Sequence, residues 1–296
     1  MTRRTIALGI LGLWVVGLAL LYRRSTFRSP EQSLAEAGMK VSPATYYYRL
    51  EQNNQQIGAA SSALDTTTAL LVATDFVRAV VPVGNDTLQM QARSVARFSR
   101  ALSMKDFILK AEGDLSPFLL RGVVQGEGTT RTLQLTTETP KNRATTEEYD
   151  IAGLVFFPTV APIPLMLGRP PEPGASMPVG IFDPLSRSVR SVNLRIQKDS
   201  LFTVTDSASL DPATGRWVKA HEESVRGWLI SGDVMTITIW VDAAGRIIAG
   251  SEPGGISLIR TTFEIAFDNW RLDRAATREG SAAKPDSASS TRARRK

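Results

Sequence analysis

Apolar and polar residues alternate with a period of two along much of the chain from residue 45 to residue 150. In the first such stretch Tyr46, Tyr48 and Leu50 are each separated by one residue, which is the spacing of one face of a β-strand. Asn53 and Asn54 follow, and Asn tolerates the left-handed backbone of a tight hairpin turn. Further strands are predicted at 57–64, 70–83, 88–98, 107–112, 118–125 and 129–137. Short strands at this spacing predict an antiparallel sheet.

An apolar, proline-rich connection interrupts the alternation. Its first part, 151–167, is apolar, and we predict a short helix around 151–157. A second transmembrane helix is the alternative for this stretch. Pro158, Pro162 and Pro164 argue against it, because a proline inside a helix costs about 3 kcal/mol. The connection separates two halves of the β-rich domain, at 45–150 and 179–270.

The second half returns to the period of two. Val192, Leu194 and Ile196 share one strand face, and 242–245 closes a hairpin in which Gly245 is placed for a left-handed backbone. Strands are predicted at 192–197, 201–205, 217–223, 235–241, 247–249 and 256–267. The fold class is therefore mainly β: a curved antiparallel sheet or half-barrel with one short helix, preceded by a single N-terminal transmembrane helix.

The transmembrane prediction rests on residues 5–22. This segment has no charge, is bracketed by arginines, and as a helix would span about 27 Å, close to the hydrocarbon thickness of a bilayer. A cleaved signal peptide is the alternative, but Leu20 and Leu21 follow the small-residue triplet at 17–19 and no polar region precedes it. We predict an uncleaved signal-anchor, with residues 1–4 as a short tail and 23–44 as a spacer.

Charge is concentrated at the two ends of the chain. The net charge is +6, yet residues 29–270 hold 22 bases and 26 acids, which is −4. A basic footprint for nucleic acid is therefore absent from the domain. Residues 271–296 carry eight bases against three acids and few large apolar groups, so we predict a disordered basic tail. The chain has no cysteine, which excludes disulfides and thiolate-ligated metals.

No catalytic, cofactor-binding or metal-binding residues are predicted. His221 is the only histidine, and without a nucleophile motif it is interpreted as a surface or strand residue. The aromatic residues permit an apolar pocket, with ordinary core and cross-strand packing as the alternative interpretation. The residues proposed to line such a pocket are Tyr46, Tyr48, Trp217, Trp228 and Trp240.

Several short motifs carry a family resemblance. The second half contains Val-Gly-Ile-Phe-Asp-Pro at 179–184, Ile-Trp-Val-Asp-Ala-Ala-Gly-Arg at 239–246 and Glu-Pro-Gly-Gly at 252–255, and the first hairpin opens with Tyr-Tyr-Tyr-Arg-Leu at 46–50. In this order they resemble the bacterial domain-of-unknown-function family 3108 and, more loosely, the periplasmic half-barrel lipoprotein carriers of the Lol system. The resemblance implies a curved antiparallel sheet partly closed by a helix, which in the carriers holds acyl chains. It implies no catalytic residues.

These observations predict a non-enzymatic domain, anchored in the inner membrane through 5–22, that binds a lipid, a lipidated protein or an envelope partner. The flanking arginines nearly balance, so the prediction that the body faces the periplasm or exterior depends on the resemblance. Two alternatives stay open. One is a hydrolase of envelope polymers that works through paired carboxylates. The other is a structural scaffold that binds no ligand and has no cofactor.

Overall fold

The computed structural model describes residues 30–282, except 85, 115, 128–129, 141, 152, 185, 234–237 and 253. The predicted transmembrane segment 5–22 lies outside the described residues. Within them, no helix is long and apolar enough to cross a bilayer.

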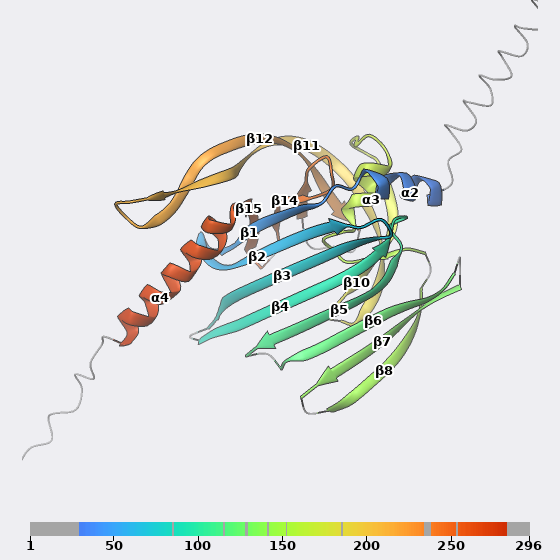
Figure 1. Ribbon diagram of the computed structural model, residues 1–296, viewed down its shortest axis with the longest axis horizontal. Helices are drawn as coiled ribbons and strands as arrows, with labels where there is room; N and C mark the ends of the chain where they lie inside the picture. The colour runs from blue at the N-terminus through green and yellow to red at the C-terminus, as the bar shows by residue number, and fades with distance from the viewer. Residues whose placement is uncertain are drawn as a thin grey trace, which may run out of the picture.

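The described chain forms one fifteen-stranded, nearly closed barrel-like sheet, which confirms the mainly β prediction (Figure 1). An eight-stranded antiparallel meander comes first. Its strands are β1 (Ala44–Gln52), β2 (Gln55–Thr66), β3 (Leu70–Val83), β4 (Asp86–Ser99), β5 (Met104–Gly113), β6 (Phe118–Glu127), β7 (Thr130–Thr139) and β8 (Asn142–Ile151). The β1–β2 turn places Asn53 and Asn54 at φ 51° and 62°, so the predicted left-handed hairpin is confirmed.

The second set of strands pairs with the first through β1 and β15. Its strands are β9 (Val155–Phe156), β10 (Ser176–Asp183), β11 (Ser188–Asp211), β12 (Arg216–Gly232), β13 (Thr238–Val241), β14 (Ile247–Ser251) and β15 (Ile256–Thr261). Only β9 and β10 are parallel among the described pairs. The strands predicted at 192–197 and 201–205 are parts of the single strand β11, which with β12 forms a long hairpin extending beyond the barrel (Figure 1).

Among the described residues, four helical segments accompany the sheet: α2 (Pro30–Lys40), α3 (Pro162–Gly168), the π-helix η1 (Glu264–Asp268) and α4 (Asn269–Ala282). The predicted helix at 151–157 is wrong, since this stretch contains the end of β8 and the short strand β9. The helix α3 begins with Pro162 instead, in the first turn, where a proline needs no hydrogen-bonded amide.

Two further corrections concern the C-terminal end. The strand predicted at 256–267 stops at Thr261 and continues as η1. The predicted disordered tail begins inside a helix, because α4 runs to Ala282. Its alanines and arginines favour helix, and it packs against the sheet through Trp270. Residues 283–296 lie outside the described part of the chain.

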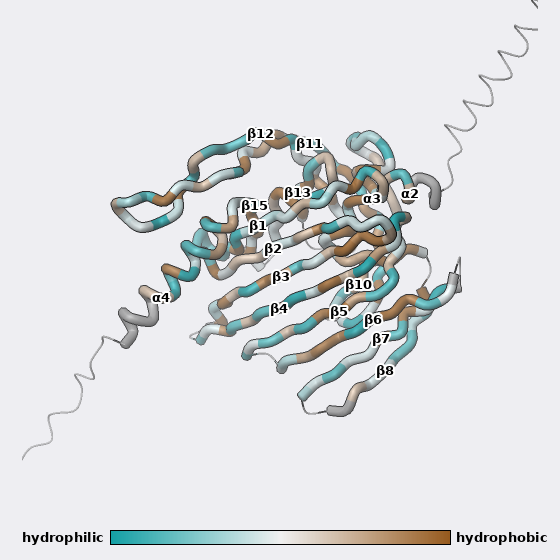
Figure 2. Tube along the Cα trace, in the orientation of Figure 1, coloured by the Kyte–Doolittle hydropathy of each residue, from teal (hydrophilic) through white to brown (hydrophobic). Residues whose placement is uncertain are grey.

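The main core fills the inner side of the sheet and is closed at one end by α2 and α3. Hydrophobic positions gather beside α3 (Figure 2). Phe107 and Phe182 pack with their ring centroids 4.7 Å apart, and both side chains are fully buried. Gly122 faces Phe107 so closely that a Cβ would lie 2.1 Å from the ring. The inner face is thus a packed core, and its residues come from both halves of the chain.

Candidate functional site

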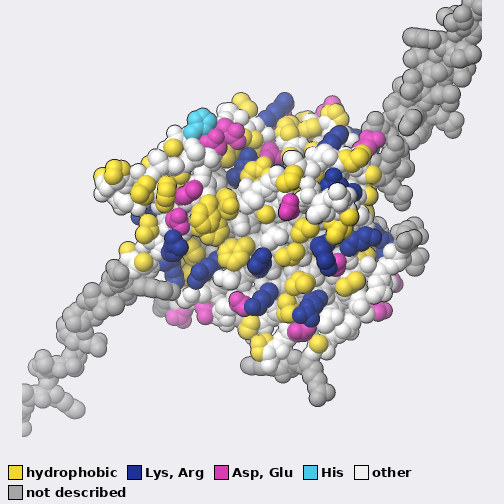
Figure 3. Space-filling view, in the orientation of Figure 1, with side chains coloured by type: hydrophobic (Ala, Val, Ile, Leu, Met, Phe, Trp, Pro, Cys, Tyr) yellow, Lys and Arg dark blue, Asp and Glu magenta, His cyan; other side chains and the backbone are white. Residues whose placement is uncertain are grey.

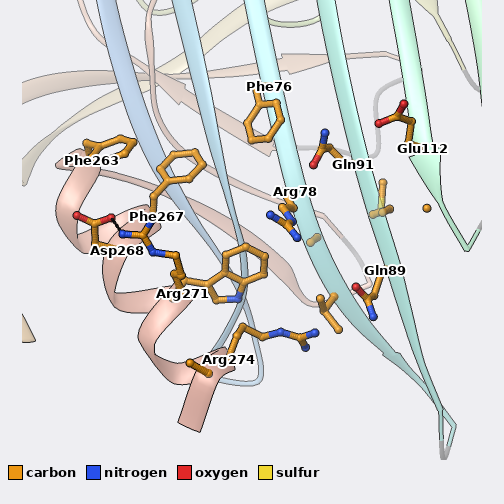
Figure 4. Close-up of a pocket in the computed structure, with 16 residues that line it drawn as sticks. Phe76, Arg78, Gln89, Gln91, Glu112, Phe263, Phe267, Asp268, Arg271 and Arg274 are labelled. Atoms are coloured by element: carbon orange, nitrogen blue, oxygen red, sulfur yellow. Dashed lines mark hydrogen bonds and ion pairs between the residues drawn. The ribbon is translucent and has the colours of Figure 1, made fainter. Parts of the chain in front are cut away.

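A groove lies on the outer side of the sheet, between the η1–α4 segment and strands β3, β4 and the end of β5 (Figure 4). We call it the α4 groove. Its volume is about 520 Å³, within the range of about 300–1,000 Å³ that small-molecule sites occupy. Its lining residues are Phe76, Arg78, Ala79, Val80, Gln89, Met90, Gln91, Glu112, Gly113, Phe263, Phe267, Asp268, Trp270, Arg271, Arg274 and Ala275.

Two different periodicities build the two walls. On β3, Phe76, Arg78 and Val80 are two residues apart, so they share the outer face of the sheet. Strand β4 continues this wall, because Arg78 pairs with Gln91 and Val80 with Gln89. The helical wall follows a spacing of four and three residues, which places its side chains on one helix face. Its apolar members are Phe263, Phe267 and Trp270.

Aromatic rings cover the apolar part of the groove. Phe263 and Phe267 stack with centroids 5.2 Å apart, and Phe76 lies 6.1 Å from Phe267. Tyr47 on β1 packs against both Phe263 and Phe267 in T-shaped arrangements. Phe263 is nevertheless 43% exposed. An aromatic cluster that stays partly open to solvent is typical of a binding surface rather than of a core.

Three arginines belong to the polar part of the groove. The Arg78 guanidinium lies 5.9 Å from the centre of the Trp270 ring, in a cation–π arrangement. Arg271 forms an ion pair with Asp268, in which a guanidinium nitrogen lies 2.9 Å from Oδ1. Arg274 extends from α4 toward β3 (Figure 4). Within the described residues, neither Arg78 nor Arg274 forms an ion pair. With Glu112 as the second acid, the groove holds three bases and two acids. Figure 3 shows basic and hydrophobic side chains side by side on this face.

Polar contacts fix the helical wall in place. Gln56 Nε2 donates a hydrogen bond to the Ala266 carbonyl oxygen at 2.7 Å, which ties η1 to β2. Asn269 makes two bonds with the backbone of Trp217: its Oδ1 accepts from the amide at 2.9 Å, and its Nδ2 donates to the carbonyl at 2.8 Å. Arg216 and Asp273 add an ion pair at 2.7 Å. The helix is therefore held by both β2 and the β11–β12 hairpin.

A second polar cluster lies on the inner side of the sheet. Tyr46 and Tyr48 line a cavity of about 10 Å³ together with Thr159 and Arg246. The Tyr48 hydroxyl donates to the Ile247 carbonyl at 3.3 Å, and burial raises the pKa of this tyrosine. Burial lowers the pKa of Arg246, whose guanidinium donates to the Ser42 carbonyl at 2.8 Å. This cavity has room for about one water molecule, so it does not suit a lipid.

Asp75 projects into the same interior from β3. Its Oδ2 accepts from the Thr159 hydroxyl at 2.7 Å, and Ser94 lies 3.5 Å away. The residue as a whole is half-buried, but Oδ1 is inaccessible and has no partner among the described residues. Burial raises the pKa of this carboxyl. Hydrogen bonds with Ser62, Thr159 and Ser94 act in the opposite direction, but burial is the larger effect.

The residues proposed from the sequence to line a pocket are divided among separate places. Tyr46 and Tyr48 share the small inner cavity. Trp228 is 7% exposed in the main core. Trp240 packs on Phe202 with their ring centroids 4.8 Å apart. Trp217 lies on the β11–β12 hairpin beside α4. None of the five lines the α4 groove.

Histidine and carboxylate side chains are the remaining groups that could serve catalysis or bind a metal. His221 is exposed on β12, with Nδ1 2.7 Å from Asp206. In the part of the chain that the structure describes, no group of three or more His, Asp or Glu could hold a metal ion. Glu112 and Asp268 both line the α4 groove, but Asp268 is bonded to Arg271. A hydrolase that uses paired carboxylates stays an untested prediction.

The sequence reasoning missed the groove residues, although a signal was present. Phe263, Phe267 and Trp270 have helical spacing. The strand predicted at 256–267 covered Phe263 and Phe267, and the basic residues from Arg271 onward were assigned to a tail. Phe263 and Phe267 at the end of the predicted strand, Trp270 and the first basic residues of the predicted tail together form one amphipathic pattern. Interpreting them as one helix would have predicted the helical wall.

Comparisons with known proteins do not name a family. No protein-family profile and no curated protein matches the chain. One similar solved structure is a β-barrel-like protein of domain of unknown function DUF1849 from Brucella abortus: the TM-score is 0.48 at 13% identity, covering 74% of this chain and 94% of that one. Another is a DUF1089 family protein from Pseudomonas aeruginosa, with a TM-score of 0.36 at 14% identity, covering 66% and 90%. The resemblance to family 3108 stays a prediction.

Proposed function

We propose that this protein is a membrane-tethered envelope domain that binds the acyl chain of a lipid or of a lipidated protein in the α4 groove. One observation carries the proposal: the aromatic cluster of the groove stays partly open to solvent. The Phe263 side chain in this cluster is 43% exposed, although its neighbours Ala266 and Trp270 are buried. A bound acyl chain would remove this aromatic surface from water, which is favourable by about 25 cal/mol per Å² of apolar area.

The anchor part of the proposal depends on residues 5–22, and the outward orientation of the body depends on the family resemblance. Alkaline phosphatase fused after Lys296 in a bacterial host tests the orientation. We expect an active phosphatase. An inactive phosphatase, together with fluorescence from a cytoplasmic reporter at the same site, would reverse the topology.

Photo-crosslinking in the native membrane tests the groove itself. A photoreactive benzoylphenylalanine replaces Phe263, which lines the groove, in the full chain. The matched control carries it at Leu272, which is 46% exposed on α4 but does not line the groove. We expect a lipid or acyl adduct at position 263 and little at 272.

Two results would contradict the proposal. Equal lipid labelling at both positions would mean that α4 lies on a membrane surface, as basic amphipathic helices do. Absence of any lipid adduct at position 263 would mean that the groove does not hold an acyl chain.

A further inference from the structure

We propose that the ligand of the α4 groove carries a phosphate headgroup, which Arg78, Arg271 and Arg274 bind while the aromatic rings hold the chain. This rests on the proposed function and adds the class of ligand. The arginines come from two walls, β3 and α4, so a group between them would be contacted from both sides. Phosphate suits this arrangement because it offers several acceptor oxygens, whereas a carboxylate offers two.

The position of Arg78 over Trp270 supports the proposal. The Arg78 guanidinium carbon lies over the indole, 5.9 Å from the ring centre. A guanidinium carries five N–H donors in a planar fork whose geometry matches phosphate. Arg78 is exposed and has no carboxylate partner within the described residues, so these donors are satisfied by water when no ligand is bound. An anion could replace that water without breaking an internal ion pair.

The charge of the surroundings makes the three arginines distinctive. The body at 29–270 carries a net charge of −4, so it does not attract anions in general. Asp268 neutralises Arg271 through a bond of 2.9 Å, and Glu112 is the other acid of the groove. The groove therefore keeps a local excess of positive charge beside apolar rings, which complements a lipid phosphate.

The test measures binding of soluble probes to the full chain by calorimetry in nanodiscs of a galactolipid, whose headgroup carries no phosphate, with empty nanodiscs as background. The probes are octyl phosphate, octyl glucoside and inorganic phosphate. We expect octyl phosphate to bind at least about tenfold more tightly than octyl glucoside, because a charge-assisted bond adds to the same apolar contact. Added salt should weaken the binding of octyl phosphate and leave that of octyl glucoside nearly unchanged.

Variants locate the effect. Arg78→Gln and Arg274→Gln should each weaken octyl phosphate binding by about tenfold and leave octyl glucoside binding within about twofold. The matched control is Arg121→Gln, which removes an exposed arginine of β6 that does not line the groove and should change neither affinity. Circular dichroism of each variant checks that the fold is retained. Arg78→Lys keeps the charge but removes the planar fork of N–H donors, so we expect it to lose part of the affinity.

The outcomes separate the inference from the function on which it rests. Equal affinity for octyl phosphate and octyl glucoside, unaffected by the arginine variants, would overturn the phosphate inference and leave acyl-chain binding standing. No binding of either octyl probe would overturn both. Inorganic phosphate bound as tightly as octyl phosphate would show an anion site without a chain site, and would overturn the lipid assignment.

Discussion

The inner face of the sheet and the α4 groove differ in how they hold arginine. On the inner face, Arg260 is 8% exposed and lies 2.8 Å from Asp242, with the Tyr46 ring 4.4 Å from its guanidinium. In the groove, Arg78 is exposed, and its guanidinium carbon lies over the Trp270 ring, 5.9 Å from the ring centre. Access to water accounts for this difference. A buried guanidinium without a partner is costly, so Arg260 needs Asp242, whereas the exposed Arg78 is hydrated and needs no carboxylate. The comparison teaches that the inner arginine stabilises the fold, while the outer arginines stay available to a ligand.

Removing one core ring should give the largest effect. Phe107 is 1% exposed. Its ring centroid lies 5.0 Å from that of Phe157 and 4.7 Å from that of Phe182. We expect Phe107→Ala to lower the free energy of unfolding by about 3–5 kcal/mol, measured by urea denaturation. Phe263→Ala is the matched variant in the groove and should cost about 1 kcal/mol or less, since this ring is already 43% exposed. Equal costs would mean that the groove ring belongs to the core.

Breaking the buried ion pair should have a comparable effect. Arg260→Met leaves the Asp242 carboxylate buried without its guanidinium, so we expect a loss of about 3–5 kcal/mol in the same assay. The control, Arg121→Met, breaks an exposed pair with Glu138 at 2.7 Å and should cost about 1 kcal/mol or less. If Arg260→Met costs no more than Arg121→Met, the paired inner arginine is not needed for stability, and the contrast with the groove fails.

Asp75 should make stability depend on pH. The pKa of Asp75 in the folded state is raised above the unfolded value of about 3.9. Below that pH the carboxyl is protonated in both the folded and the unfolded protein, so it does not lower the free energy of unfolding. As pH rises toward the folded pKa, the unfolded state releases its proton first, and stability falls by at most about 1.4 kcal/mol per pH unit. Asp75→Asn mimics the protonated form. Urea denaturation from pH 4 to pH 8 should show a smaller decline for this variant than for the wild type. Parallel profiles would show that the carboxyl titrates normally.

The smallest effect is expected at the contact between α4 and the long hairpin. Asn269→Ala removes both hydrogen bonds to the Trp217 backbone, which should cost about 1–2 kcal/mol, mostly through local opening. Hydrogen exchange should show faster exchange of the Trp217 amide, with the amides of β5 unchanged. Unchanged exchange at Trp217 would mean that the hairpin is held without this residue.

The sequence predicted most of the sheet because alternation and turn residues agree in it. Strand β3 has the predicted bounds, and Gly245 adopts φ 77° in the predicted hairpin. It missed β8, whose residues at 144–148 are all exposed, so no apolar alternation marks the strand. Pairing with β7 makes it a strand, and that pairing is a tertiary property.

The candidate site was harder to predict for a related reason. Its two walls are far apart in the chain, with Phe76 and Arg78 on β3 and the aromatic helix near the C-terminus. Each wall has a readable period, but the sequence contains no signal that they face each other. The boundary at Arg271 also separated Trp270 from the arginines that share its helix.

Quenching of individual tryptophans by a brominated octyl phosphate would test the central claim most directly. Trp270 lines the α4 groove, whereas Trp228 lies in the inner core. With the full chain in nanodiscs, we predict saturable quenching that is largely abolished by Trp270→Phe and retained in Trp228→Phe. Quenching that survives Trp270→Phe and disappears in Trp228→Phe would place the chain inside the sheet and contradict the account.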